Sequence, residues 1–313
     1  MTHLATGAPR RGRALAFLAL AGLAVAALQR MDIGQAIASL ATVRVEWLVV
    51  GTLCYAAILP LWALQWDLLA PRAAVRRPRD MFGVVALTSA VLNTTPMLVG
   101  EAAAVVLLVA RAGLDRAAAL SVLAMDQLLV GVAKLVVLSA AALAAPLPGW
   151  MTRALLALCL ALVALGGSLA IAAWRHADVA GWLSRILPPR GAAAVGAFAS
   201  SLEPLRSPSR GVPALVLALL KKAVEVGAIL CVQRAFGLHL PIAGAVLVLA
   251  MLNLATLLPI VPGDVGVFEA AVVLSLTRMG VEAELALGIA VVQHLCYFVA
   301  LAAPGLVWAA RDR

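Results

Sequence analysis

The stretch from Leu258 to Ala271 reads L-P-I-V-P-G-D-V-G-V-F-E-A-A and interrupts a long apolar part of the chain. Pro259 and Pro262 cannot continue the hydrogen-bond ladder of a helix, because proline has no backbone N–H. Gly263 and Gly266 allow backbone angles that other residues avoid. Within a bilayer, irregular backbone survives only where protein or a water-filled cavity covers it. The stretch therefore predicts a helix break that lines a site, with a short loop outside the membrane as the alternative.

Composition places the whole chain in a membrane. Of its 313 residues, 64% are hydrophobic and 12% are charged, and the mean hydropathy is +1.05. Soluble domains do not have this composition, so we expect a single all-α polytopic membrane domain over residues 1–313. The net charge of +9 does not indicate a nucleic-acid partner, because arginines in short loops set membrane topology and contact anionic headgroups. The four cysteines lie in apolar segments without C-x-x-C spacing, so ligand or disulfide roles are not expected.

A second interrupted segment covers residues 81–110, where L-N-T-T-P-M-L-V-G-E runs from Leu92 to Glu101. Each arm has about 10–15 residues, which is short of the roughly 20 that a spanning helix needs. Residues 81–110 therefore predict a re-entrant helical hairpin, and residues 241–277 around the opening stretch predict another. Two short full spans in each segment are the alternative.

The remaining apolar segments predict about six full spans, and one long polar connection lies between them. A signal peptide is the alternative for the first segment, but a membrane helix is favoured because many spans follow it. Residues 175–210 form the polar connection, in which Val179, Trp182, Leu183 and Ile186 recur at helical spacing. This spacing predicts a cytoplasmic interfacial amphipathic helix, with a plain loop as the alternative. The predicted spans are 14–28, 47–69, 117–145, 151–174, 211–236 and 282–310.

The two interrupted segments and their surroundings resemble each other, which indicates an internal duplication of residues 14–145 and 151–310. Similar apolar composition alone would produce part of this likeness. Each half would contain two spans, a hairpin and a span, so its number of crossings is odd and the halves are inverted. Broken helices in inverted repeats are a transporter architecture. The corresponding residues are Asn93 and Asn253, Glu101 and Glu269, Gly113 and Gly280, and Asp126-Gln127 and Gln293-His294.

The distribution of positive charge supports this topology. With both interrupted segments re-entrant and the N-terminus cytoplasmic, sixteen arginines lie inside and five outside. If each interrupted segment crossed once, the split would be eleven inside and ten outside. We therefore expect a multi-pass protein of the bacterial inner membrane with both termini cytoplasmic. The first hairpin would enter from the cytoplasm and the second from outside.

Polar residues at membrane depth are costly and are functional candidates. Glu101 and Glu269 would bind a cationic headgroup, carry protons, or simply accept hydrogen bonds from backbone N–H groups freed at each break. His294 would titrate near neutral pH or satisfy a neighbour. The candidate substrate-binding residues are Asn93, Pro96, Gly100, Glu101, Asp126, Asn253, Pro262, Gly263, Asp264, Gly266, Glu269 and His294.

Four further ionisable residues lie within the predicted spans. Lys221 and Lys222 are four and three residues before Glu225, so we expect these groups to neutralise one another. Lys134 is expected to pair with a hairpin carboxylate across a helix interface. The chain has no G-x-S-x-G, H-E-x-x-H or P-loop motif and no His cluster. We therefore expect no catalytic residues, no metal and no cofactor.

The opening motif resembles the transmembrane region of the lysylphosphatidylglycerol synthase family, in which P-G-G-x-G-x-x-E precedes an apolar helix, a Gly-acidic turn and a final span. Asp264 stands where the family usually has a second Gly, Ala104 where Arg is frequent, and Phe268 where a polar residue is common. We expect no counterpart here of the soluble aminoacyl-transfer domain of the full-length synthases. The residues that match are Pro262, Gly263, Gly266, Glu269 and Gly280, with Pro96, Gly100 and Glu101 for an earlier P-x-x-x-G-E element.

The resemblance implies a flippase-like transporter that moves a lipid or a lipid-linked headgroup and does not aminoacylate it. Its partners would be membrane lipids and a lipid-synthesis enzyme. A competing hypothesis is an integral-membrane enzyme acting in polyprenyl, hopanoid or glycolipid synthesis, for which Glu101 with Asp126 is the best acid–base cluster. A non-catalytic subunit of such a pathway, or a small-solute transporter with His294 coupling protons, would also fit the sequence.

Overall fold

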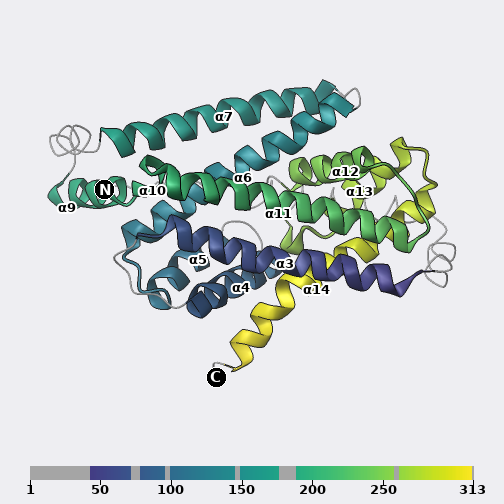
Figure 1. Cartoon of the computed structure of the whole chain (residues 1–313), viewed down its shortest axis with the longest axis horizontal. Coiled ribbons are helices and arrows are strands. Elements are labelled where there is room, and N and C mark those ends of the chain that lie inside the picture. Colours follow the sequence, from purple (N-terminus) through teal and green to yellow (C-terminus); the bar gives the residue numbers. More distant parts are fainter. Residues whose placement is uncertain are drawn as a thin grey trace, which may run out of the picture.

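The computed structural model describes residues 43–71, 78–95, 99–144, 149–175, 188–256 and 261–311, and every regular element in these ranges is helical. Two long helices, α3 (Val45–Leu69) and α11 (Pro208–Ala235), lie side by side at its centre (Figure 1). They are antiparallel, because the backbone N–H of Arg44 donates to Ala235 O at 2.9 Å and Arg210 Nε donates to Leu68 O at 2.9 Å. Each helix therefore begins where the other ends.

Each interrupted segment forms a hairpin of two short helices packed together, and each hairpin is followed by a helix of 29 residues. The hairpin arms have 17, 12, 14 and 12 residues. At a rise of 1.5 Å per residue the arms measure about 18–26 Å, less than the roughly 30 Å of a hydrocarbon core. The first hairpin is α4 (Pro78–Thr94) with α5 (Val99–Ala110), and the second is α12 (Ile242–Ala255) with α13 (Val267–Arg278); α6 (Arg116–Ala144) and α14 (Ala283–Arg311) follow them.

The hairpins lie towards opposite ends of the α3–α11 pair, and each is held by the other half of the chain (Figure 1). Helix α14 packs against α4, and α6 packs against α12. Gly305 permits the closer of these crossings, since a Cβ at this position would clash with the backbone carbonyl oxygen of Ala86. Small residues at such crossings let membrane helices approach without a hydrophobic driving force between them.

Four described helices are long and apolar enough to cross a membrane: α3, α6, α7 (Gly149–Trp174) and α14. Side chains on the outer face of α7 are strongly exposed, including Leu160 at 72% and Val163 at 73%, as expected of a surface that contacts lipid. The predicted span 211–236 is α11, which has 28 residues but carries Lys221, Lys222 and Glu225 in its middle. The predicted span 14–28 lies outside the described residues.

The connection between α7 and α11 contains two short helices where the structure describes it. The predicted amphipathic face of Val179, Trp182, Leu183 and Ile186 lies outside the described residues. Beyond it, α9 (Pro189–Ser200) packs on α6, where Ser121 Oγ donates to Ser201 O at 3.3 Å, and α10 (Glu203–Arg206) precedes α11.

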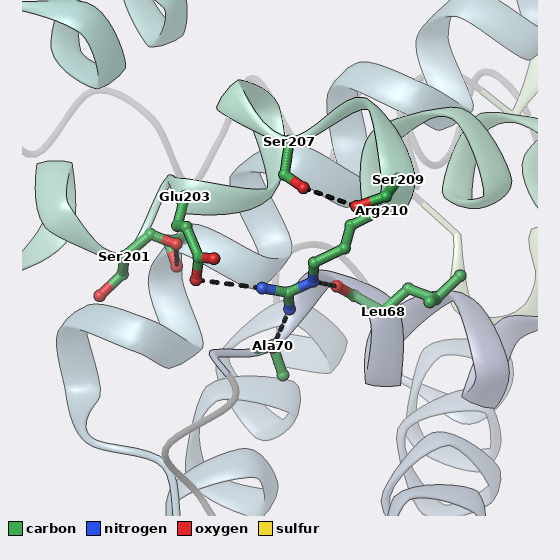
Figure 2. A network of polar contacts seen from close by, with 8 residues as sticks. Leu68, Ala70, Ser201, Glu203, Ser207, Ser209 and Arg210 are labelled. Atoms are coloured by element: carbon green, nitrogen blue, oxygen red, sulfur yellow. Dashed lines mark hydrogen bonds and ion pairs between the residues drawn. The ribbon is translucent and has the colours of Figure 1, made fainter.

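Arg210, predicted to lie in the polar connection, belongs to the first turns of α11 and is only 4% exposed. Its Nη1 donates to Glu203 Oε2 at 3.1 Å and its Nη2 donates to Ala70 O, beside the bond from Nε to Leu68 O (Figure 2). The last carbonyl groups of a helix have no partner within the helix, and a cation is favourable there. Arg210 therefore caps the C-terminus of α3 and fixes it to the start of α11.

We expect Arg210→Met to lower the free energy of unfolding by about 2–3 kcal/mol, because the bonds to a charged donor are lost while the side chain keeps its length. The exposed Arg206 on α10 supplies the control, and Arg206→Met should change stability by less than about 0.5 kcal/mol. The thermal unfolding midpoint of each purified variant in detergent measures the difference. Equal midpoints for the two variants would show that Arg210 does not fix these helix ends.

The crossing of α14 on α4 gives a second prediction. Gly305→Ala should destabilise the protein by about 1–3 kcal/mol, because its methyl group would be forced against the Ala86 carbonyl. Gly167→Ala in α7 is the matched control, since a Cβ there would meet no atom within 4 Å. Thermal unfolding should separate the two variants, and a Gly305→Ala protein as stable as the Gly167→Ala protein would contradict the close crossing.

Candidate functional site

The second helix break lies against the last turn of α4, next to the first break. Gly263 has φ +62°, and a Cβ added to it would lie 2.9 Å from the backbone carbonyl oxygen of Asn93, in the last turn of α4. Asp264 and Gly266 also have positive φ, at +53° and +85°. Glycine at position 263 is therefore required both by its backbone angles and by the carbonyl beside it. Pro96 lies outside the described residues, and Pro262 begins the 3₁₀ turn η1 (Pro262–Asp264).

Glu269 holds the second break in place. Its Oε2 accepts a hydrogen bond of 2.6 Å from the backbone N–H of Gly266, and its Oε1 lies 2.7 Å from His294 Nδ1. The first contact caps α13, and the second ties α13 to α14. Phe268 stacks on the imidazole of His294 with ring centroids 4.3 Å apart. The alternative in which Glu269 accepts a freed backbone N–H is the arrangement present here, and His294 satisfies a neighbour.

A cavity of about 150 Å³ opens beside this break. Its walls come from α3, α6, α11, α12, α13, α14 and η1, so both halves of the chain contribute. Tyr55, Tyr297 and Phe268 supply aromatic walls. The charged and strongly polar lining residues are Lys134, Lys222, Glu225, Asn253, Asp264 and His294.

The cavity contains one satisfied ion pair. Lys222 Nζ donates to both carboxylate oxygens of Glu225, at 2.9 and 2.8 Å, and to Asn253 Oδ1 at 3.2 Å. The predicted pairing of Lys222 with Glu225 is confirmed. The predicted pairing of Lys221 with Glu225 is wrong, because Lys221 Nζ lies 4.0 Å from Asp126 Oδ1 and 5.5 Å from the ring centroid of Trp62. The two lysines are about 100° apart around the helix and so face different neighbours.

Lys134 lines the cavity without the ion pair predicted for it. Within the part of the chain that the structure describes, no carboxylate oxygen lies within 4.0 Å of its Nζ. Asp264, on the facing break, likewise accepts no side-chain hydrogen bond from a described residue. The cavity therefore contains a cation and an anion that are not bonded to each other.

The predicted site residues Gly100, Glu101 and Asp126 of the first half lie outside the cavity. Gly100 sits against Leu92, with no room for a Cβ, and so brings α5 close to α4. Glu101 Oε2 is buried and has no hydrogen-bond partner among the described residues. Asp126, 4% exposed, lies beside Lys221 and shares no hydrogen bond with Glu101. These three residues are not part of the cavity lining.

The structure thus brings together Asn253, Gly263, Asp264 and His294 from the predicted set, with the backbone of Asn93 and with Glu269 behind His294. Sequence reasoning placed Lys134, Lys222 and Glu225 in the membrane but did not bring them to this site. Nothing in the sequence around Tyr55 and Tyr297 predicted a place in this site, apart from their being polar aromatic residues in apolar segments. In the described ranges, no group of three or more His, Cys, Asp and Glu side chains could hold a metal ion.

A family model for the lysylphosphatidylglycerol synthase TM region matches residues 13–305. The chain belongs to this family. The match includes both hairpins, the cavity-lining helices and α7, so the lysylphosphatidylglycerol synthase TM region extends over nearly the whole chain and makes it a multi-pass membrane protein. Comparison with curated proteins finds no match, and comparison with solved structures finds none.

The contact between Gly263 and the end of α4 is testable with two glycines of similar positive φ, Gly263 at +62° and Gly113 at +67°. Alanine at either position costs about 1–2 kcal/mol in that conformation. Gly113→Ala should cost only this, since a Cβ there meets no atom within 4 Å. Gly263→Ala should cost about 1–3 kcal/mol more, because its methyl group is pressed against the Asn93 carbonyl. The thermal unfolding midpoints of the two variants are compared in detergent. Equal losses of stability would show that Gly263 does not lie against the Asn93 carbonyl.

Proposed function

We propose that this protein is a flippase-like transporter that moves a lipid or a lipid-linked headgroup across the bacterial inner membrane. The observation that carries the proposal is the charged cavity beside the helix break, enclosed by helices from both halves of a membrane protein. Placing the charges of Lys134, Lys222, Glu225 and Asp264 inside such a protein is costly. A function that needs a polar site within the membrane accounts for them.

The arrangement of charge and apolar surface supports lipid rather than a fully polar solute as the cargo. A headgroup must be desolvated to enter a bilayer, and the cavity offers it charges and hydrogen bonds. The outer faces of the helices remain apolar, as the exposed Leu160 and Val163 of α7 illustrate. Acyl chains would stay among the lipids while only the headgroup moves through the protein.

The proposed topology is an inverted repeat with two re-entrant hairpins that enter from opposite faces and both termini in the cytoplasm. The antiparallel α3–α11 pair supports it, as do the equal lengths of α5 and α13 and of α6 and α14. Gly113 and Gly280 have φ of +67° and +83° and occupy the same place, between the second hairpin arm and the long helix. In this arrangement α11 crosses the membrane alongside α3.

Transport is proposed in preference to catalysis. The enzyme hypothesis relied on Glu101 acting together with Asp126, and Asp126 is instead placed beside Lys221 and Trp62. A lipid-synthesis enzyme that delivers the cargo remains part of the proposal as a partner.

The test is lipid movement in vesicles reconstituted with the purified protein and chain-labelled lipids of several headgroup classes. We expect movement above that of empty vesicles for at least one class. Thr256→Phe should slow it by partly filling the cavity, whereas Thr277→Phe should not. The two threonines are matched, since each hydroxyl donates to the carbonyl four residues earlier at 2.8 Å. Rates equal to those of empty vesicles for every class would overturn the proposal.

A further inference from the structure

The cavity presents two opposite charges that have no hydrogen bond or close ion pair among the described residues. Lys222 forms hydrogen bonds with Glu225 and Asn253, and Glu269 forms them with Gly266 and His294. Lys134 and Asp264 have no such partners in the described part of the chain. They reach the same cavity from different elements, Lys134 from α6 and Asp264 from η1.

We propose that this cavity binds a zwitterionic headgroup of the phosphoethanolamine type, with its primary ammonium at Asp264 and its phosphate at Lys134. This inference rests on the proposed transport function and assigns its substrate class. A purely anionic group would neutralise Lys134 and leave Asp264 facing a like charge. A purely cationic group would do the reverse, and a neutral group would pair with neither charge.

Hydrogen-bonding chemistry distinguishes the primary ammonium from a quaternary one. An –NH₃⁺ group donates charge-assisted hydrogen bonds to a carboxylate, whereas a trimethylammonium group has no donor. Phe268 and Tyr297 line the same cavity as Asp264, and aromatic rings suit an organic cation of either kind. Asp264 therefore supplies the preference for the primary amine.

The size of the cavity suits a small headgroup. Its volume of about 150 Å³ is enough for several water molecules. A small phosphate ester with a short amine is of this order of size. Asp264 stands where the family pattern usually has glycine, so the amine preference belongs to this chain.

The test compares chain-labelled phosphatidylethanolamine, phosphatidylcholine and phosphatidylglycerol in vesicles reconstituted with the full chain. We expect phosphatidylethanolamine to move about tenfold faster than either of the others, the effect of one charge-assisted hydrogen bond. Asp264→Asn should reduce this ratio towards one. Lys134→Gln should slow phosphatidylethanolamine and phosphatidylcholine alike. Glu282→Gln, a carboxylate-to-amide change at an exposed position before α14, should leave the ratio unchanged.

The aspartate variant is compatible with the fold, since asparagine and glycine both tolerate the φ of +53° at position 264. Asp264→Gly is the second variant and should lose the same preference. If the three lipids move equally fast, or if Asp264→Asn and Asp264→Gly keep the full preference, the inference is overturned and the transport function stands.

A binding measurement separates the two proposals. The thermal unfolding midpoint in detergent is compared with added phosphatidylethanolamine, phosphatidylglycerol or soluble phosphoethanolamine. Stabilisation by phosphatidylethanolamine alone supports a lipid-borne headgroup, and equal stabilisation by soluble phosphoethanolamine supports recognition of the free headgroup. Selective stabilisation without any lipid movement would overturn the transport function and keep the headgroup site. Stabilisation by phosphatidylglycerol to the same extent would overturn the headgroup site.

Discussion

Broken backbone inside a membrane protein must be covered, and this requirement governs the arrangement around the second break. Residues 261–266 cannot form a continuous helix, so their polar groups need partners that water does not supply. Part of the solution is local, since Glu269 accepts the N–H of Gly266. The rest is tertiary, because Gly263 packs against the Asn93 carbonyl at the end of α4. The second break lies against the end of α4, which fixes the second hairpin relative to the first and leaves a cavity beside the break.

The contact between the breaks is maintained by helices that approach closely. Lipid tails are as apolar as leucine, so helix association in a membrane depends on packing and hydrogen bonds. The α14–α4 crossing at Gly305 and the hairpin turn at Gly100 both leave no room for a side chain. Arg210 adds a polar anchor where α3 ends and α11 begins. Each hairpin is therefore held by the helix that follows the other hairpin, and the cavity is formed jointly.

The two helix breaks were predictable because their causes are local: proline removes a donor and glycine admits left-handed angles. The ends of α5 and α13 followed for the same reason, through Gly113 and Gly280. Side-chain partners were not predictable, because they depend on which helices meet. Arg210 was assigned to a polar connection but caps α3, and Lys221 faces Asp126 across a helix interface. The predicted site included Glu101 and Asp126, which the packing keeps out of the cavity.

Lys221 and Lys222 lie on different faces of α11 and take part in different polar clusters. Consecutive residues point about 100° apart on a helix. Lys221 therefore faces α6, and Lys222 faces α12 of the second hairpin. Asp126 and the face of Trp62 surround the first, and Glu225 and Asn253 bind the second. Since Lys222 is compensated within its own helix, it makes little demand on a ligand. Lys134 and Asp264, which have no close ion-pair partner among the described residues, belong to α6 and to the break. A headgroup bound between them would therefore bridge those two elements.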